Sequence, residues 1–428
     1  MRLGGRAQAA IEVLEDMAKR KRPVANALKD WGLSHRFAGS GDRAAIGNLV
    51  YDTLRKKSSQ AVLAASDEVR LSVFATLLRQ WNYSSEELSS KFAEDKFAPL
   101  MPSGEEIERL LSKDIDDVPA ADLADIPLWC VESFEANFGD DWVTEAKALS
   151  ERPPLDIRVN TLKSNRDKVA RHLSRNHPVP TKLARQGLRI APGNRDSRLP
   201  NVQAETGFQK GWFEIQDEGS QVVADLVFAR PGEKILDYCA GGGGKTLALA
   251  ASLENRGQIH AYDSDKIRLA PIHERLKRAG TRNVQVHGAD DDLSHLLEKM
   301  DKVVVDAPCS GSGTWRRRPD AKWRLTRENL ETRLREQEEV LSQAAQYLRP
   351  GGVLCYITCS LFPEENENQV YSFIDDNPGY ELLSAGEVWQ DLFGFDNLQP
   401  WSSDMKSVTL TPASTKTDGF YFAVMQRQ

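Results

Sequence analysis

Cysteine and histidine are scarce in this chain of 428 residues, which holds five cysteines and seven histidines. The histidines are scattered and no two cysteines have the Cys-x2-Cys spacing of a zinc site, so no metal site is expected. The cysteine count is odd, and the first residues turn acidic too soon for a secretion signal, which argues against a disulfide framework. Free thiols are therefore expected, and a conspicuous cysteine becomes a candidate nucleophile.

The chain also lacks a long apolar run and an excess of positive charge. No segment approaches the roughly 20 apolar residues of a membrane-spanning helix, so no membrane contact is expected and a cytoplasmic protein is favoured. The net charge of −7 argues against a protein that binds nucleic acid over its whole surface. Binding of RNA through a local basic patch stays open. No feature indicates an obligate protein partner.

The chain is too long for one hydrophobic core, and three patterns of apolar residues follow one another along it. Residues 1–140 are predicted to be all-α, because apolar residues recur there at helical spacing. Residues 141–221 mix strand-like and helical patterns, which predicts a small α+β subdomain. Over residues 222–428 short apolar strands alternate with helices, which predicts a Rossmann-like, doubly wound α/β sheet with ligands at the carboxyl ends of its strands.

A glycine cluster, Gly241 to Gly244, follows the first strand of this predicted sheet and precedes a helix. Glycines let the backbone approach a ligand closely, and the helix N-terminus offers free N–H groups. Asp263 and Asp290 end the next two strands, where carboxylates can reach ribose hydroxyls and an adenine edge. Because the spacing fits neither phosphate-binding fingerprint, the pattern predicts an adenosyl ligand without a phosphate chain. Alternatively, the glycines form a tight turn and the two aspartates cap helices.

Cys309 and Cys359 stand directly after the fourth and fifth predicted strands, in DAPCSGSG and ITCSLFPEENE. Both are expected at the carboxyl edge of the sheet, beside the ligand, where a thiol can ionise and act as a nucleophile. Most cysteines are small buried hydrophobes, a description that suits Cys130 and Cys355. It suits Cys309 and Cys359 poorly, because polar and glycine- or proline-bearing loops flank them.

A basic run follows Cys309 and is interleaved with Trp315 and Trp323. Guanidinium groups bind phosphates and indoles stack on bases, so the run predicts an RNA contact. A solvated loop with a local excess of charge is the alternative. The candidate RNA-binding residues are Arg316, Arg317, Arg318, Lys322 and Arg324.

Several motifs together resemble a known family: DYCAGGGGKT, DAPCSGSG, RRRPDAKWR, YITCSLFPEENE and the closing DGFYFAV. They are similar to those of the RNA cytosine carbon-5 methyltransferases of the Sun/Fmu and nucleolar-protein type. The resemblance covers most of residues 125–428 and implies S-adenosyl-L-methionine as methyl donor and RNA as substrate. Ribosomal RNA is the favoured target, with tRNA or DNA as alternatives. A non-catalytic RNA-binding assembly factor is a further alternative, although both loop cysteines are present.

The same resemblance implies residue roles. Cys359 would attack the base, Cys309 would aid product release, and Asp306 would contact the target cytosine. The cofactor-binding residues it implies are Cys239, Ala240, Gly241, Gly242, Gly243, Gly244, Lys245, Asp263, Asp290 and Asp306. One departure is Gly242, where the family usually has proline; this loosens the loop and removes no polar contact, so activity is expected to persist.

The first 140 residues resemble, more weakly, the NusB-like helical domain of bacterial members, through ALKDWG and DRAAIGNLVYDTLR. This implies a role in RNA binding or placement. Lys19–Arg22 and Arg55–Lys57 are candidates for that role, and a solvated charged face explains them equally well.

Overall fold

The computed structural model describes residues 1–394 and 398–428. Contacts between residues divide the chain into two compact units. The first comprises Met1–Pro153, Pro192–Leu199 and Trp315–Leu325. The second comprises Pro154–Ala191, Pro200–Thr314 and Thr326–Gln428. Two short segments of the chain therefore group with the first unit although the second unit flanks them in sequence, and one of them begins six residues after Cys309.

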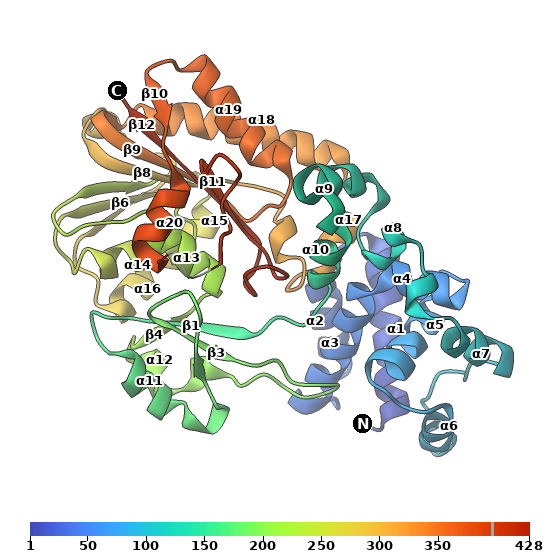
Figure 1. Cartoon of the computed structure of the whole chain (residues 1–428). Helices are drawn as coiled ribbons and strands as arrows, with labels where there is room; N and C mark the ends of the chain where they lie inside the picture. The colour runs from blue at the N-terminus through green and yellow to red at the C-terminus, as the bar shows by residue number, and fades with distance from the viewer. Residues whose placement is uncertain (395–397) are drawn as a thin grey trace. The chain divides into compact units, whose positions relative to one another are not determined.

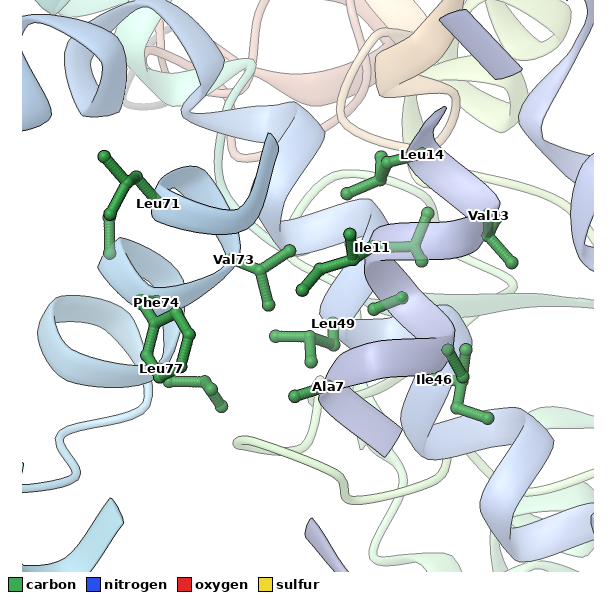
Figure 2. Packing of buried hydrophobic residues seen from close by; sticks show 14 of the residues in the cluster. Ala7, Ile11, Val13, Leu14, Ile46, Leu49, Leu71, Val73, Phe74 and Leu77 are labelled. Carbon is green, nitrogen blue, oxygen red and sulfur yellow. The ribbon is translucent and has the colours of Figure 1, made fainter. Parts of the chain in front are cut away.

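The first unit is helical, as its apolar spacing predicts. In two of its helices, α6 and α7, a serine N-cap and a glutamate three residues later satisfy the free N–H groups of the first turn. Residues from α1, α3 and α5, among them Ile11, Leu49 and Phe74, meet in one buried apolar cluster (Figure 2). The helices are α1 (Leu3–Arg20), α2 (Val24–Ser34), α3 (Ser40–Arg55), α4 (Lys57–Ala64), α5 (Val69–Ala75), α6 (Ser85–Ala93), α7 (Gly104–Ser112), α8 (Ala120–Leu123), α9 (Val131–Phe138), α10 (Trp142–Ala148) and α17 (Pro319–Arg324).

The second unit contains a small antiparallel sheet and a large mixed one. The small sheet has the strand order β2-β3-β1-β4 and packs on α11 and α12 around an apolar cluster that includes Ile157 and Phe213. Its elements are β1 (Leu155–Val159), α11 (Arg166–His172), β2 (Val179–Pro180), β3 (Gly187–Ile190), α12 (Thr206–Gln209) and β4 (Phe213–Ile215).

The large sheet has the order β10-β12-β9-β8-β5-β6-β7, with β11 beside β12. Strands β5 to β9 run parallel to one another, and β12 is antiparallel to β9. The strands are β5 (Lys234–Asp237), β6 (Gln258–Tyr262), β7 (Val284–His287), β8 (Met300–Asp306), β9 (Leu348–Thr358), β10 (Tyr380–Leu382), β11 (Ser407–Leu410) and β12 (Phe420–Arg427). The helices are α13 (Glu218–Leu226), α14 (Gly244–Ser252), α15 (Lys266–Leu269), α16 (Ile272–Ala279), α18 (Arg327–Ala345), α19 (Glu367–Asp376) and α20 (Ala385–Phe393).

Helices cover both faces of this sheet, and its central strands are therefore apolar on both sides. Residues of α13, α14 and α20 pack with Val304 and Ile357 on one face, and residues of α18 and α19 pack with Val303 and Val305 on the other (Figure 1). This confirms the Rossmann-like prediction. The strand order reverses between β5 and β8, which is where open α/β sheets bind ligands.

The predicted division into domains at residues 140 and 221 stays a prediction. The contacts give two compact units, and the first break between them falls after Pro153. Among the described helices none combines the length and apolarity needed to cross a membrane.

Candidate active site

The two loop cysteines lie together at the carboxyl edge of the large sheet. Parallel strands β8 and β9 pair Asp306 with Ile357, so the loops that follow them begin side by side. The Sγ atoms of Cys309 and Cys359 are 3.4 Å apart, and both residues are partly exposed. The backbone N–H of Gly313 donates to the carbonyl of Cys359 at 3.0 Å. Cys355, which lies within β9, is buried, as expected.

The contact between the thiols changes the acidity of Cys309. The hydrogen bond with Cys359, together with burial, raises the pKa of Cys309 well above its usual value. Cys309 therefore keeps its proton at neutral pH and can donate it in a hydrogen bond to the sulfur of Cys359. The Cys309 thiol is thus placed as a hydrogen-bond donor beside Cys359.

Asp306 ends β8 and forms an ion pair with Lys245 in the first turn of α14, at 3.0 Å. The ammonium group also donates to the hydroxyl of Ser220 at 3.0 Å. Only 6% of the Lys245 side chain is exposed, against 31% of Asp306, so the carboxylate is the part of the pair that faces outward. The sequence indicated both residues, yet not that they pair, and it gave no signal for Ser220.

The glycine loop after β5 needs glycine at two positions. Gly241 has φ of +49° and Gly243 has φ of +80°, a region that side-chain-bearing residues rarely adopt. A Cβ at Gly243 would also lie 2.6 Å from Ile272. Gly242 is different, because its φ lies outside that region and a Cβ there would meet only the guanidinium of Arg275. Gly242, where the family usually has proline, is thus a position at which neither the backbone conformation nor the space requires glycine.

Asp263 holds this loop from the neighbouring strand. Its two carboxylate oxygens accept hydrogen bonds from the backbone N–H groups of Gly241 and Asp265, each at 2.8 Å. The alternative that Asp263 caps the next helix is wrong, because Asp265 caps α15. Each oxygen of Asp263 keeps a further lone pair for a ligand hydroxyl. Asp290 lies three residues beyond the end of β7, is exposed, and pairs with Lys266.

The five cations predicted to contact RNA have different environments, and all lie in the first unit. Lys322 is fully buried, and its ammonium donates to the carbonyl of Arg55 at 2.9 Å and to the hydroxyl of Ser150 at 3.1 Å. Arg316 is 5% exposed. The prediction for Lys322 and Arg316 is therefore corrected, because buried side chains cannot present charge to a phosphate.

The remaining three cations of the run differ among themselves in exposure. Arg317 is half-buried, whereas Arg318 and Arg324 are exposed. Arg324 forms an ion pair with Asp320 one helical turn earlier, at 3.1 Å. An RNA contact through this run therefore depends chiefly on Arg318 and Arg324.

Sequence reasoning also missed the buried polar residues that surround the cysteines. The structure places Ser310, Ser312 and Ser360 in contact with one another, and Glu365 beside them. The only signal was the repetition of serine after each cysteine, followed by the glutamates of ITCSLFPEENE. Within residues 1–394 and 398–428 there is no group of three or more side chains suited to hold a metal ion.

Two protein-family models match the chain. The model for 16S rRNA methyltransferase RsmB/F matches residues 225–426, and the model for the ferredoxin-like domain of RsmF/B-like methyltransferases matches residues 126–194. A curated relative, the probable ribosomal RNA small subunit methyltransferase B of Synechocystis, is 33% identical over 310 residues. That match covers 70% of this chain and 66% of the relative, so the chain spans just under two thirds of its length.

Two solved structures are similar to this chain. NSun6 from Pyrococcus horikoshii, determined with SFG, is 25% identical with a TM-score of 0.60 and covers 70% of this chain and 98% of its own. The crystal structure of PH0851 covers 100% of both chains with a TM-score of 0.74 at 24% identity, a likeness in fold.

Proposed function

Because the chain belongs to the RsmB/F methyltransferase family, we propose that it is an S-adenosyl-L-methionine-dependent RNA methyltransferase that forms 5-methylcytosine, with ribosomal RNA as its substrate. The observation that carries the cytosine chemistry is the 3.4 Å approach of Cys309 and Cys359, in the loops that follow the paired strands β8 and β9. The target RNA is inferred from the relatives, which are described as methyltransferases of small-subunit ribosomal RNA.

The residues around the glycine loop fit an adenosyl ligand. Gly241 and Gly243 remove side chains where the loop turns, and the free N–H groups of the α14 N-terminus lie directly after it. Asp263 offers lone pairs to ribose hydroxyls. S-adenosyl-L-methionine would supply an electrophilic methyl group here. The likeness to NSun6, determined with SFG, an analogue of this donor, supports the assignment.

The cysteine pair answers a chemical need of the reaction. Carbon 5 of cytosine is too weak a nucleophile to accept a methyl group directly. The thiolate of Cys359 adds to carbon 6 and forms a C–S bond, which converts the ring to an enamine with a nucleophilic carbon 5. After methylation, a base removes the proton from carbon 5, and the electron pair of that bond restores the 5,6 double bond as the Cys359 thiolate leaves. Cys309 assists this release.

Asp306 and Lys245 act at the polar edge of the base, which carries N3 and the exocyclic amine. The partly exposed carboxylate of Asp306 can accept hydrogen bonds from the exocyclic amine of cytosine and from a proton taken up at N3 as the thiolate adds. Lys245, held by Asp306 and Ser220, fixes the carboxylate in place.

The decisive experiment measures tritiated-methyl transfer to RNA by wild type and Cys359→Ala. We expect the variant to lose activity by about a thousandfold or more, as for other enzymes that lose their nucleophile. Cys130→Ala, which changes a buried thiol of the first unit, should keep full activity. Full activity of Cys359→Ala would contradict the mechanism.

The role of Cys309 in release has its own readout. Cys309→Ala should accumulate a covalent protein–RNA adduct, visible as a shifted band on a denaturing gel. Normal turnover with no shifted band would count against it. Bisulfite sequencing of ribosomal RNA and tRNA from a deletion strain would then identify the target, and loss of a mark from tRNA alone would exclude the ribosomal assignment.

A further inference from the structure

Glu365 is a buried acid that the chemistry above does not use. It follows β9 by seven residues, is 0% exposed, and lies beneath the loop of the other strand, β8. Its carboxylate accepts the backbone N–H of Ser310 at 2.7 Å, the hydroxyl of Ser310, and the side-chain amide of Gln337 at 3.0 Å. Ser310 is the residue directly after Cys309. A carboxylate that accepts three donors holds that loop from below by both main chain and side chain.

Serine hydroxyls connect this carboxylate to the second cysteine loop. The hydroxyl of Ser360, the residue directly after Cys359, lies 3.3 Å from that of Ser310 and 3.1 Å from that of Ser312. The Ser312 hydroxyl in turn accepts the N–H of Leu361 at 2.8 Å. The residues that follow the two cysteines therefore share one hydrogen-bond network, and Glu365 is its acidic member.

The network is anchored in rigid parts of the fold. Gln337 lies on α18, is fully buried, and donates also to the carbonyl of Pro308 at 2.8 Å. The hydroxyl of Tyr356, on β9, donates to the backbone carbonyl of Glu365 at 2.7 Å. Asn366, the next residue, exchanges hydrogen bonds with Thr358 and Ser360 on either side of Cys359. Glu365 thus stands at a point where three elements meet under the thiols.

We propose that Glu365 is a positioning residue that holds the Cys309 loop against the Cys359 loop and makes Cys309 the less reactive of the two thiols. Its part in methyl transfer rests on the function proposed above; its part in thiol geometry does not. The charge of Glu365 is one cause of the raised pKa of Cys309, after the contact with Cys359 and burial. Loss of that charge should bring the reactivities of the two thiols closer together.

A purely structural role predicts something different. Buried hydrogen-bonded carboxylates also stabilise folds, and their loss lowers stability without redistributing reactivity between two neighbouring thiols. The ratio of reactivity at Cys359 to that at Cys309 therefore separates the two roles. It is measured on the protein itself and needs neither RNA nor methyl donor.

The test compares wild type, Glu365→Gln and Glu367→Gln by iodoacetamide alkylation at neutral pH, with each thiol quantified by peptide mass spectrometry. Glu367 is the matched control, because it is a neighbouring acid whose pKa burial raises to about 7 and whose charged neighbour is Asp404. We expect Cys359 to react faster than Cys309 in wild type and in Glu367→Gln. In Glu365→Gln the ratio should fall by at least about fivefold. An unchanged ratio would overturn the proposal.

Steady-state kinetics on RNA give a second readout. Glu365→Gln should lower kcat by at least about tenfold and leave KM for S-adenosyl-L-methionine within about twofold, because it disturbs the thiols and not the glycine loop. Glu365→Asp, which keeps the charge, should restore most of the alkylation ratio. If wild type transfers no methyl group, the proposed function fails while the alkylation ratio still decides the role of Glu365.

A folding defect in Glu365→Gln would not leave the question open. Ser310→Ala removes the hydroxyl that links Glu365 to Ser360 and keeps the backbone bond to the carboxylate. It should lower the alkylation ratio in the same direction by a smaller amount, about twofold. An unchanged ratio in a folded Ser310→Ala protein would contradict the network.

Discussion

Two consecutive stretches of chain follow β8 and are built in opposite ways. Residues 307–314 form the Cys309 loop, which belongs to the second unit and leaves Cys309, Ser310 and Thr314 partly exposed. Residues 315–325 belong to the first unit and bury large side chains, with Trp315 and Lys322 both at 0% exposure. The sequence suggested function in both stretches. In the second stretch the exposed cations are Arg318 and Arg324, whereas Arg316 and Lys322 are buried.

The difference shows that charge density along a sequence says little about where the charge lies. In the second stretch, Lys322 donates to two buried oxygen atoms, and the indole of Trp323 donates to the carbonyl of Leu54 at 2.7 Å. These long side chains satisfy backbone groups at the end of α3. In the first stretch, serines and glycines let the backbone turn tightly, and Cys309 itself is partly exposed.

The largest expected effect tests the catalytic side of this comparison. Asp306→Asn keeps the shape of the side chain but removes the charge that pairs with Lys245 and stabilises the adduct. We expect tritiated-methyl transfer to fall by at least about a hundredfold while the melting temperature changes by less than about 3 °C. Asp301→Asn, at the opposite end of the same strand, should keep activity. Equal losses in the two variants would contradict a chemical role for Asp306.

A second prediction concerns the buried cation of the other stretch. Burial lowers the pKa of Lys322 from 10.5 to about 7. Between those values the unfolded chain binds a proton that the folded protein does not, so folding stability rises with pH. Relative to Lys322→Met, the wild-type free energy of unfolding should therefore increase by about 2 kcal/mol from pH 7 to pH 9.

That prediction is measured by urea unfolding, with hydrogen exchange in α3 to report on the first unit. Lys56→Met is the control, since it removes a half-buried lysine that pairs with the exposed Glu151. A difference between wild type and Lys322→Met that does not change from pH 7 to pH 9 would contradict the prediction for Lys322.

The smallest effect tests whether the exposed cations of the second stretch contact RNA. Arg318→Ala should weaken RNA binding by about threefold to tenfold and reduce the salt dependence by about one ion, without loss of stability. Filter binding at several salt concentrations measures both quantities. Arg109→Ala, which removes an exposed cation from α7 of the same unit, should leave them unchanged. Identical binding by wild type and Arg318→Ala would remove this residue from the RNA surface.

Much of the candidate site could be predicted because its residues stand in short motifs at strand ends. Parallel strands bring their carboxyl ends to one edge, so Cys309, Cys359 and Asp306 were expected to meet there. Glu365 could not be found this way, since its function depends on which loop of another strand lies above it. The pairing of Lys245 with Asp306 was likewise hidden, because the two residues lie 61 positions apart.

By itself, the sequence determined the alternation of strands and helices, and with it the doubly wound sheet and the edge on which both thiols stand. Local periodicity and glycine placement suffice for this, because they act over a few residues. Only the tertiary structure decided which cations are buried, what raises the pKa of Cys309 and what holds the two cysteine loops together. Burial and hydrogen bonding depend on residues that arrive from distant parts of the chain, and no local pattern records them.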